Sequence, residues 1–127
     1  MSATSFLWVA AGGALGSVAR YWLAAFVGGL TGPYFPWGTL LINVLGSFVI
    51  GWFGAWTGAN GAVDVPADIR VFVMVGICGG FTTFSSFSLQ TLELLSAGEV
   101  MRAGYYVVGS VGLCLVSVWA GVTLARV

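Results

Sequence analysis

Four long apolar segments, separated by short stretches rich in Gly, Pro and Asp, account for almost all of this 127-residue chain. Each segment is long enough for a helix across a bilayer core, which needs roughly 20 residues. Charged residues make up only 6% of the chain and its mean hydropathy is +1.03, whereas a soluble domain carries about 25% charged residues. Because lipid cannot satisfy backbone polar groups, helices are the practical form in which such segments cross it. The sequence therefore predicts an all-α integral membrane protein.

Turn-forming residues set the limits of the predicted spans. The first segment ends in a cluster of glycines before Pro33, and the second begins at Pro36, since proline is favoured in the first turn of a helix. The third begins after Pro66, and Gly98 is a C-terminal stop. We expect one domain over residues 1–127, with four transmembrane helices at about 5–29, 37–58, 67–96 and 99–125 and no internal repeat.

The arginines give almost no orientation signal. Arg70 and Arg126 fall on one predicted side, and Arg102 on the other, joined by Arg20 if that side chain reaches outward. The positive-inside bias that orients membrane proteins is therefore close to nil. A chain without bias can insert both ways round, which would permit a dual-topology antiparallel homodimer. Four arginines are also too few to decide, so a single orientation stays open.

The composition argues against several classes of function. Histidine and lysine are absent and the formal net charge is zero, so no basic patch suggests nucleic acid. No nucleophile with a neighbouring base suggests an enzyme. Cys78 and Cys114 lie inside apolar segments, and we interpret both as small buried hydrophobes.

The first two spans each present a periodic face. Gly12, Gly16 and Arg20 recur every four residues; the glycines predict close helix packing. A cation inside a span should face an aqueous vestibule or a partner, with snorkelling to the membrane surface as the alternative. In the second span, Asn43 belongs to a polar line with one polar residue a turn before it and one a turn after. Its amide can donate two hydrogen bonds, although joining helices is the commoner role of a membrane Asn.

The third span contains GGFTTFSSFS at residues 79–88, a sequence ill suited to a continuous helix. Gly79 and Gly80 support a helix poorly, and Thr82 and Thr83 are β-branched and compete for backbone bonds. We expect a break that frees backbone carbonyls in mid-membrane, which is tolerated only inside protein or beside water. Freed carbonyls suit a hard cation such as Na⁺.

Two aromatic rings follow the predicted break. Phe84 and Phe87 share a helix face, next to hydroxyls that include Thr83 and Ser86. Ring edges are electropositive, so edges, hydroxyls and the Asn43 amide together offer an anion donors without a fixed charge. The alternative is a kinked helix packed by small residues, with the phenylalanines facing lipid.

The motif G-x-x-G-G-F-T-T-F-S-S-F-S at residues 76–88 closely resembles the signature of the Fluc (CrcB) fluoride channels. G-x-x-x-R at residues 16–20 and P-W-G-T-L-x-x-N at residues 36–43 resemble the family's first and second helices. This resemblance covers the whole chain. It implies a dual-topology antiparallel homodimer that passively exports F⁻ across the cell (inner or plasma) membrane through two pores.

The resemblance also implies roles for individual residues. A structural Na⁺ would be held at the dimer centre by the backbone carbonyls of Gly79 and Thr82 from each subunit. Gln90 stands where many members carry an acid, so conductance is expected to differ if that acid tunes passage. The implied fluoride path comprises Phe84, Phe87, Asn43, Thr83, Ser86, Tyr106 and Ser110, with Tyr105 leaving the register of the fourth span open.

The main alternative is a small dual-topology antiporter for cationic drugs or guanidinium. Such a transporter needs a membrane-embedded carboxylate to exchange protons. Asp64, Asp68 and Glu99 flank the predicted spans, and Glu93 lies near the end of the third. A packing subunit without transport is a further alternative, but it leaves the polar lines unexplained.

Overall fold

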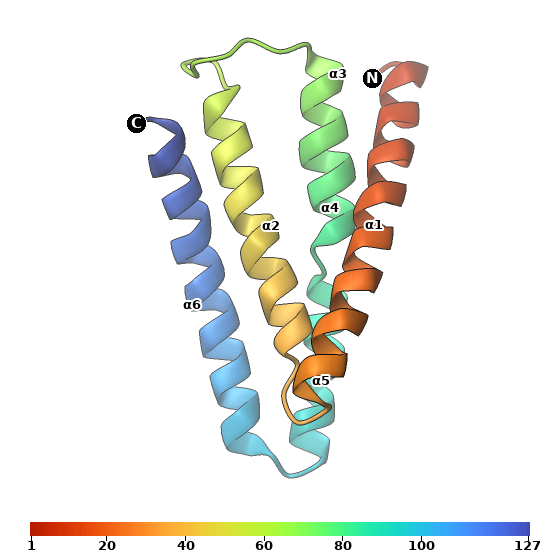
Figure 1. The fold of residues 1–127 in the computed structure, drawn as a ribbon, viewed down its shortest axis with the longest axis vertical. Helices are drawn as coiled ribbons and strands as arrows, with labels where there is room; N and C mark the ends of the chain where they lie inside the picture. The colour runs from red at the N-terminus through yellow and green to blue at the C-terminus, as the bar shows by residue number, and fades with distance from the viewer.

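The computed structural model describes residues 1–127 as an all-helical bundle without strands. The chain makes four passes along the long axis, with both termini at the same end (Figure 1). The third pass is interrupted, as the sequence predicted. The elements are α1 (Ala3–Thr31), α2 (Trp37–Trp56), α3 (Ala67–Arg70), η1 (Val71–Cys78), α4 (Gly79–Phe81), α5 (Phe84–Ser96) and α6 (Val100–Ala125).

Helix ends coincide with the turn chemistry of the sequence. Gly32 follows α1 with φ +73°, and its N–H donates to the Gly28 carbonyl at 2.9 Å. Pro36 directly precedes α2. Gly98, with φ +80°, lies in the tight connection between α5 and α6. Only glycine adopts backbone with positive φ without a steric cost, so these glycines determine where the chain reverses.

Three passes are long and apolar enough to cross a membrane: Trp37–Trp56, Ala67–Ser96 and Val100–Ala125. The first pass, α1, spans 29 residues, but it does not belong to this strongly apolar group. Arg20 and the glycines of α1 lower its mean hydropathy. The fourth span therefore stays a prediction.

At each end of the bundle, an arginine contacts residues near a connection between two helices. At the end that carries the termini, Arg70 donates through Nη1 to the Gly54 carbonyl, 3.3 Å away, and to the Thr57 hydroxyl. At the opposite end, Arg102 lies 3.8 Å from the centre of the Tyr34 ring and 3.7 Å from the Glu99 carboxylate. Both sets of contacts lie at the ends of the bundle, away from the interruption at Thr82 and Thr83.

Glycines bring α1 into close contact with the third pass. A Cβ on Gly76 would lie 2.8 Å from Gly12 Cα, and one on Gly80 would lie 2.6 Å from the Gly13 carbonyl oxygen. A Cβ on Gly16 would come 2.8 Å from the Phe81 nitrogen. These distances leave no room for a side chain, which confirms the predicted packing surface at Gly12 and Gly16.

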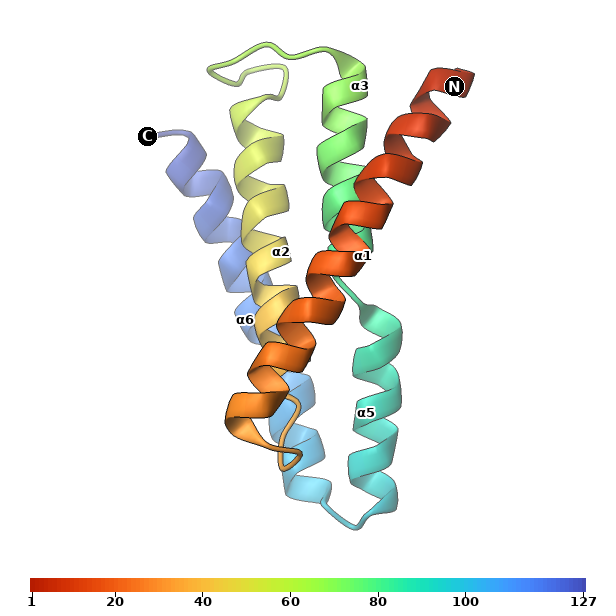
Figure 2. The ribbon, with the colours of Figure 1, turned by 45° about the vertical axis from the view of Figure 1, so that its right-hand side comes forward.

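The interruption itself is confined to Thr82 and Thr83. Their φ, ψ pairs are −79°, 155° and −149°, 108°, which is extended backbone, and the ribbon narrows to a thin link there (Figure 2). Our expectation that Gly79 and Gly80 contribute to the break is wrong, because both are helical. Gly80 serves the contact with α1 instead, so Gly80 is a packing residue and the break belongs to the threonine pair.

A second irregularity has no counterpart in our sequence predictions. Residues Val71–Cys78 wind as a π-helix, although this run of apolar residues contains no local signal for wide winding. π-Helical segments are rare in proteins, and those that occur are often found near functional sites. It lies directly before α4 and packs on α1.

Little of the single chain is enclosed. Only 17 of 127 residues are buried, so most apolar side chains face outward, as expected for surfaces covered by lipid or by another chain. The principal enclosed cluster joins Leu40 of α2, Phe87 of α5 and Tyr106 of α6. This cluster lies beside the interrupted pass and supports the site described next.

Candidate functional site

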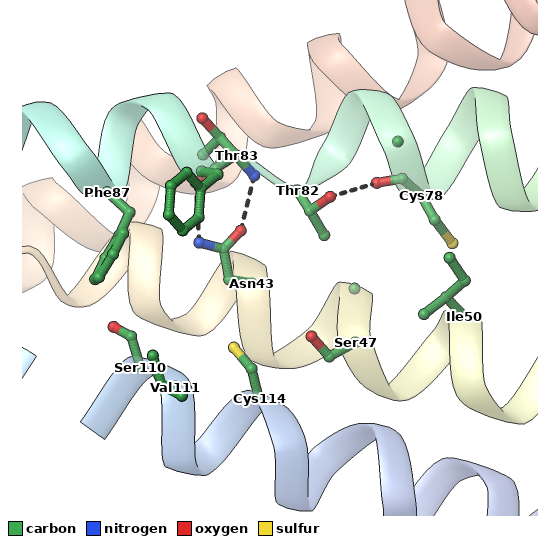
Figure 3. A pocket seen from close by; sticks show the side chains of 13 residues that line it. Asn43, Ser47, Ile50, Cys78, Thr82, Thr83, Phe87, Ser110, Val111 and Cys114 are labelled. Carbon is green, nitrogen blue, oxygen red and sulfur yellow. Dashed lines mark hydrogen bonds between the residues drawn. The ribbon is translucent and has the colours of Figure 1, made fainter. Parts of the chain in front are cut away.

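Asn43 of α2 holds the interruption in the third pass. Its Nδ2 donates to the Thr83 carbonyl at 3.1 Å, and its Oδ1 accepts from the Thr83 N–H at 2.8 Å, both drawn in Figure 3. In a continuous helix the Thr83 N–H would donate to the Gly79 carbonyl four residues earlier. The amide therefore replaces the helical bonds of an extended residue with a matched pair from a neighbouring helix.

The two threonines also cap the helices on either side of them. Thr82 Oγ1 donates to the Cys78 carbonyl at 2.9 Å, and Thr83 Oγ1 accepts from the Ser86 N–H at 3.1 Å. In a continuous helix that Ser86 N–H would donate to the Thr82 carbonyl. Both Gly79 and Thr82 thus lose the amide donor that helical winding would give to their carbonyl oxygens.

A cavity of about 330 Å³ lies beside the break. Asn43 from α2, Phe87 from α5 and Ser110 from α6 face it from three elements (Figure 3). No Asp, Glu or Arg lines it, so its polar groups are amides, hydroxyls, thiols and backbone. The lining residues are Asn43, Gly46, Ser47, Ile50, Cys78, Gly79, Thr82, Thr83, Phe84, Phe87, Ser110, Val111 and Cys114.

The two predicted rings lie together but in different surroundings. Phe87 is 9% exposed, and its ring centre lies 5.0 Å from that of Tyr106. Phe84 lies 5.4 Å from Phe87, yet it is 77% exposed on the single chain. Phe87 is thus an interior ring and does not face lipid, whereas Phe84 presents its ring to whatever covers this side of the molecule.

Ser110 carries the clearest polar irregularity of the site. Its hydroxyl oxygen is buried and has no hydrogen-bond partner within the chain. A buried polar group without a partner costs about 1–3 kcal/mol. Because Ser110 lines the cavity, a group with hydrogen-bonding capacity inside that cavity would satisfy it.

Tyr106, one helical turn before Ser110, is fully buried and donates its hydroxyl to Gln90 Oε1 at 2.7 Å. Tyr105 is 64% exposed, so the inward register of α6 contains Tyr106 and Ser110. Gln90 also lines a second cavity of about 420 Å³, together with Thr39 and Glu93. The hydrogen-bonded pair therefore lies between the break and a cavity near the α1–α2 connection.

Two further predicted residues lie outside the cavity lining. Ser86 is half-buried, and its backbone N–H serves the cap at Thr83. Arg20, for which we expected an aqueous vestibule or a partner, is half-buried and donates from Nε to the Gly80 carbonyl at 3.1 Å. Its observed partner is thus a backbone group next to the break.

Three polar lining residues were not among the predicted path residues. Ser47 stands in the predicted polar line one turn after Asn43, and Cys114 follows Ser110 by one turn, so helical periodicity places both on the cavity face. Cys78 is 3% exposed, as expected for a buried hydrophobe, but it also lines the cavity. From the sequence we treated Cys78 only as a hydrophobic residue and did not consider its thiol as part of a cavity lining.

Comparison with known proteins gives a consistent result. The family described as "CrcB-like protein, Camphor Resistance (CrcB)" matches residues 7–122. A protein of Methylocella silvestris named "Fluoride-specific ion channel FluC" is 57% identical over 120 residues, covering 94% of this chain and 92% of its own. One of the same name from Rhodospirillum rubrum is 57% identical over 117 residues, covering 92% and 91%. "Fluoride-specific ion channel FluC 1" of Nitrobacter hamburgensis is 49% identical over 127 residues, covering 100% and 99%.

The match extends over the interrupted pass, the Asn43 contact and the α6 face, and it accompanies three passes of membrane-spanning length. The protein is thus a multi-pass membrane protein, and the chain belongs to the CrcB-like protein family.

Proposed function

We propose that this chain forms a passive, fluoride-selective ion channel rather than an enzyme or a coupled transporter. The observation that carries the proposal is the uncharged cavity beside the break, where the unpartnered Ser110 hydroxyl meets Asn43 and Phe87. The relatives named above are called fluoride-specific ion channels, which agrees with this chemistry.

Neutral donors suit a small, strongly hydrated anion. Conduction requires groups that replace water but bind weakly enough to release the ion. The Ser110 hydroxyl is free to donate, and Asn43 Nδ2 uses one hydrogen on Thr83 and keeps a second. A ring edge of Phe87 adds a weak electropositive contact. A fixed cation would trap the ion, and a carboxylate would repel it.

The functional unit that we propose is an antiparallel homodimer in which α1 is the fourth span of each chain. Phe84 is 77% exposed and few residues are buried in the single chain, so a second chain has apolar surface to cover. The near absence of orientation bias permits an inverted copy. Two pores would then be lined by both subunits, with Phe84 enclosed by the partner.

The residues at the break also fit a structural Na⁺. The Gly79 and Thr82 carbonyls lose their helical donors because Asn43 takes the Thr83 N–H and Thr83 takes the Ser86 N–H. Carbonyl oxygens are ligands that hard cations accept, and Gly79 is exposed on the single chain. We propose that these two carbonyls from each subunit bind Na⁺, which would join the halves electrostatically.

A proton-coupled antiporter is the weaker alternative. No carboxylate lines the cavity at the break, and Glu93 is an exposed residue of the second cavity. Exchange of a cationic drug for protons has no carrier at the break, so we do not favour it.

Fluoride efflux from liposomes tests the proposal. Vesicles with the purified protein, loaded with KF, should release F⁻ when valinomycin lets K⁺ leave and balance the charge. Vesicles loaded with KCl should retain Cl⁻, and protein-free vesicles should retain both. Absence of F⁻ release, equal release of Cl⁻, or guanidinium–proton exchange without F⁻ release would each refute the channel.

Replacing Gln90 by Glu should make efflux pH-dependent. The carboxylate keeps the acceptor for Tyr106 but adds a negative charge near the proposed path. We expect efflux at about pH 8 to fall roughly tenfold, a barrier increase of about 1.4 kcal/mol, because like charges repel. As the pH falls and the carboxyl group is protonated, the repulsion disappears and efflux should rise.

The measurement is the initial F⁻ efflux rate between about pH 4 and pH 8, a range that includes the ordinary glutamate pKa of about 4.3, with the leak of protein-free vesicles subtracted. Gln90→Leu, which removes the acceptor without adding charge, separates the loss of the hydrogen bond from the charge effect. A pH-independent rate in Gln90→Glu equal to that of the unmodified protein would place Gln90 off the path.

A further inference from the structure

Gly80 comes between Gly79 and Thr82 in the sequence, and its carbonyl oxygen accepts a hydrogen bond from a side chain of another helix. In a continuous helix it would accept from the Phe84 N–H. Instead Arg20 of α1 donates to it from Nε at 3.1 Å. Hydrogen bonds from a guanidinium are charge-assisted and stronger than neutral ones, and a cation at a helix C-terminus is further favoured by the helix dipole.

We propose that Arg20 is a positioning residue: by binding the Gly80 carbonyl, it fixes α4 so that the Gly79 and Thr82 carbonyls are held in place for the bound cation. This inference rests on the structural Na⁺ of the proposed function. It assigns Arg20 a role through the backbone, in place of attraction of anions in a vestibule.

Packing between α1 and α4 makes this contact specific. A Cβ on Gly16 would lie 2.8 Å from the Phe81 nitrogen, so α1 touches the backbone of α4 one turn before Arg20. A Cβ on Gly80 would lie 2.6 Å from the carbonyl oxygen of Gly13, which is also in α1. This close backbone contact places Arg20 within reach of the Gly80 carbonyl.

The segment is thus held from two sides. Arg20 of α1 binds the Gly80 carbonyl on one side of Thr82, and Asn43 of α2 binds both backbone groups of Thr83 on the other. Gly79–Phe81 is the C-terminal end of the helical run that starts at Ala67 and continues through η1, and the last carbonyls of a helix have no following turn to supply their donors. The contacts from α1 and α2 therefore hold the backbone groups on the two sides of Thr82.

Three substitutions separate the hydrogen bond from the charge. Arg20→Gln places an amide nitrogen at the same chain position as Nε, so it keeps a donor and removes the charge. Arg20→Met has a similar length and offers neither. Arg20→Lys keeps the charge but moves the donor one bond further out. Arg102→Met, which changes an arginine bound to Tyr34 and Glu99, is the matched control.

The readout is the melting temperature of the purified dimer in detergent as Na⁺ replaces N-methyl-D-glucamine. Compared with the unmodified protein, the half-stabilising Na⁺ concentration should stay within about threefold for Arg20→Gln, which keeps a donor to the Gly80 carbonyl. It should rise by at least about tenfold for Arg20→Met, because that carbonyl then has no side-chain donor and is no longer held in place. Arg102→Met should leave it unchanged. F⁻ efflux is measured in parallel.

Several results would overturn the inference. One is an unchanged Na⁺ midpoint in Arg20→Met. Another is normal efflux in Arg20→Lys together with lost efflux and an unchanged Na⁺ midpoint in Arg20→Gln, which would assign Arg20 an electrostatic role. If Arg20→Met does not assemble, Arg20→Gln still tests the inference: loss of Na⁺ stabilisation in Arg20→Gln would contradict the positioning role of Arg20. An unmodified protein that conducts F⁻ but shows no Na⁺ dependence would refute the cation site and this inference, leaving the channel intact.

Discussion

Phe87→Ile is expected to slow fluoride efflux about a hundredfold, a barrier increase of about 2.7 kcal/mol, while the protein still assembles. Isoleucine keeps an apolar side chain in the enclosed cluster with Leu40 and Tyr106 but has no electropositive ring edge to present to the cavity. The loss therefore falls on the ion and much less on the fold. Initial efflux rates and size-exclusion profiles in detergent measure the two effects separately.

Phe53→Ile is the matched control for this experiment. Phe53 of α2 is also 9% exposed but does not line the cavity, so its replacement removes an equally buried ring away from the path. We expect near-normal efflux from Phe53→Ile. Phe84→Ile should reduce efflux as strongly as Phe87→Ile if a partner chain encloses its exposed ring. Unchanged efflux in both Phe84→Ile and Phe87→Ile would remove the ring edges from the mechanism.

Asn43→Leu is expected to abolish measurable efflux and to destabilise the protein. The substitution leaves the Thr83 N–H and carbonyl without the partners they have at 2.8 and 3.1 Å. Loss of partners for two enclosed backbone groups costs about 2 kcal/mol or more. An apparent melting temperature lower by roughly 10 °C is the corresponding thermal effect.

Thermal unfolding in detergent and hydrogen exchange at residues 82–86 measure this change. Exchange should accelerate at Thr83, because its N–H loses its acceptor. Asn60→Leu, at the exposed asparagine of the α2–α3 loop, controls for the general effect of the substitution. An Asn43→Leu protein with normal melting, exchange and efflux would show that the extended backbone at Thr82 and Thr83 does not depend on Asn43.

The overall architecture was predictable because it depends on local chemistry. Apolar length determines the passes, and residues such as Pro36 and Gly98 determine their ends. The break at Thr82 and Thr83 was also predictable, since β-branched hydroxyl residues favour capping and extended backbone over helix. For the site, periodicity placed Asn43 on a polar line and the family resemblance placed Ser110 on the same path, and both residues line one cavity.

Features that depend on contacts between distant segments were not predictable. Gly80 reads as a helix breaker in isolation, but its closeness to Gly13 makes it a packing residue. The partner of Arg20 is a backbone carbonyl, and every residue of the chain offers one, so no sequence pattern singles it out. The π-helix of Val71–Cys78 likewise has no local signal.

The extended pair Thr82 and Thr83 has a mechanical consequence. Backbone hydrogen bonding within the third pass stops there: η1 and α4 pack chiefly on α1, while α5 packs chiefly on α6. The two Asn43 hydrogen bonds hold Thr83, at this point, to α2. A force that displaces α5 relative to α4 would therefore act on these two bonds before it acts on the backbone bonds inside the long helices.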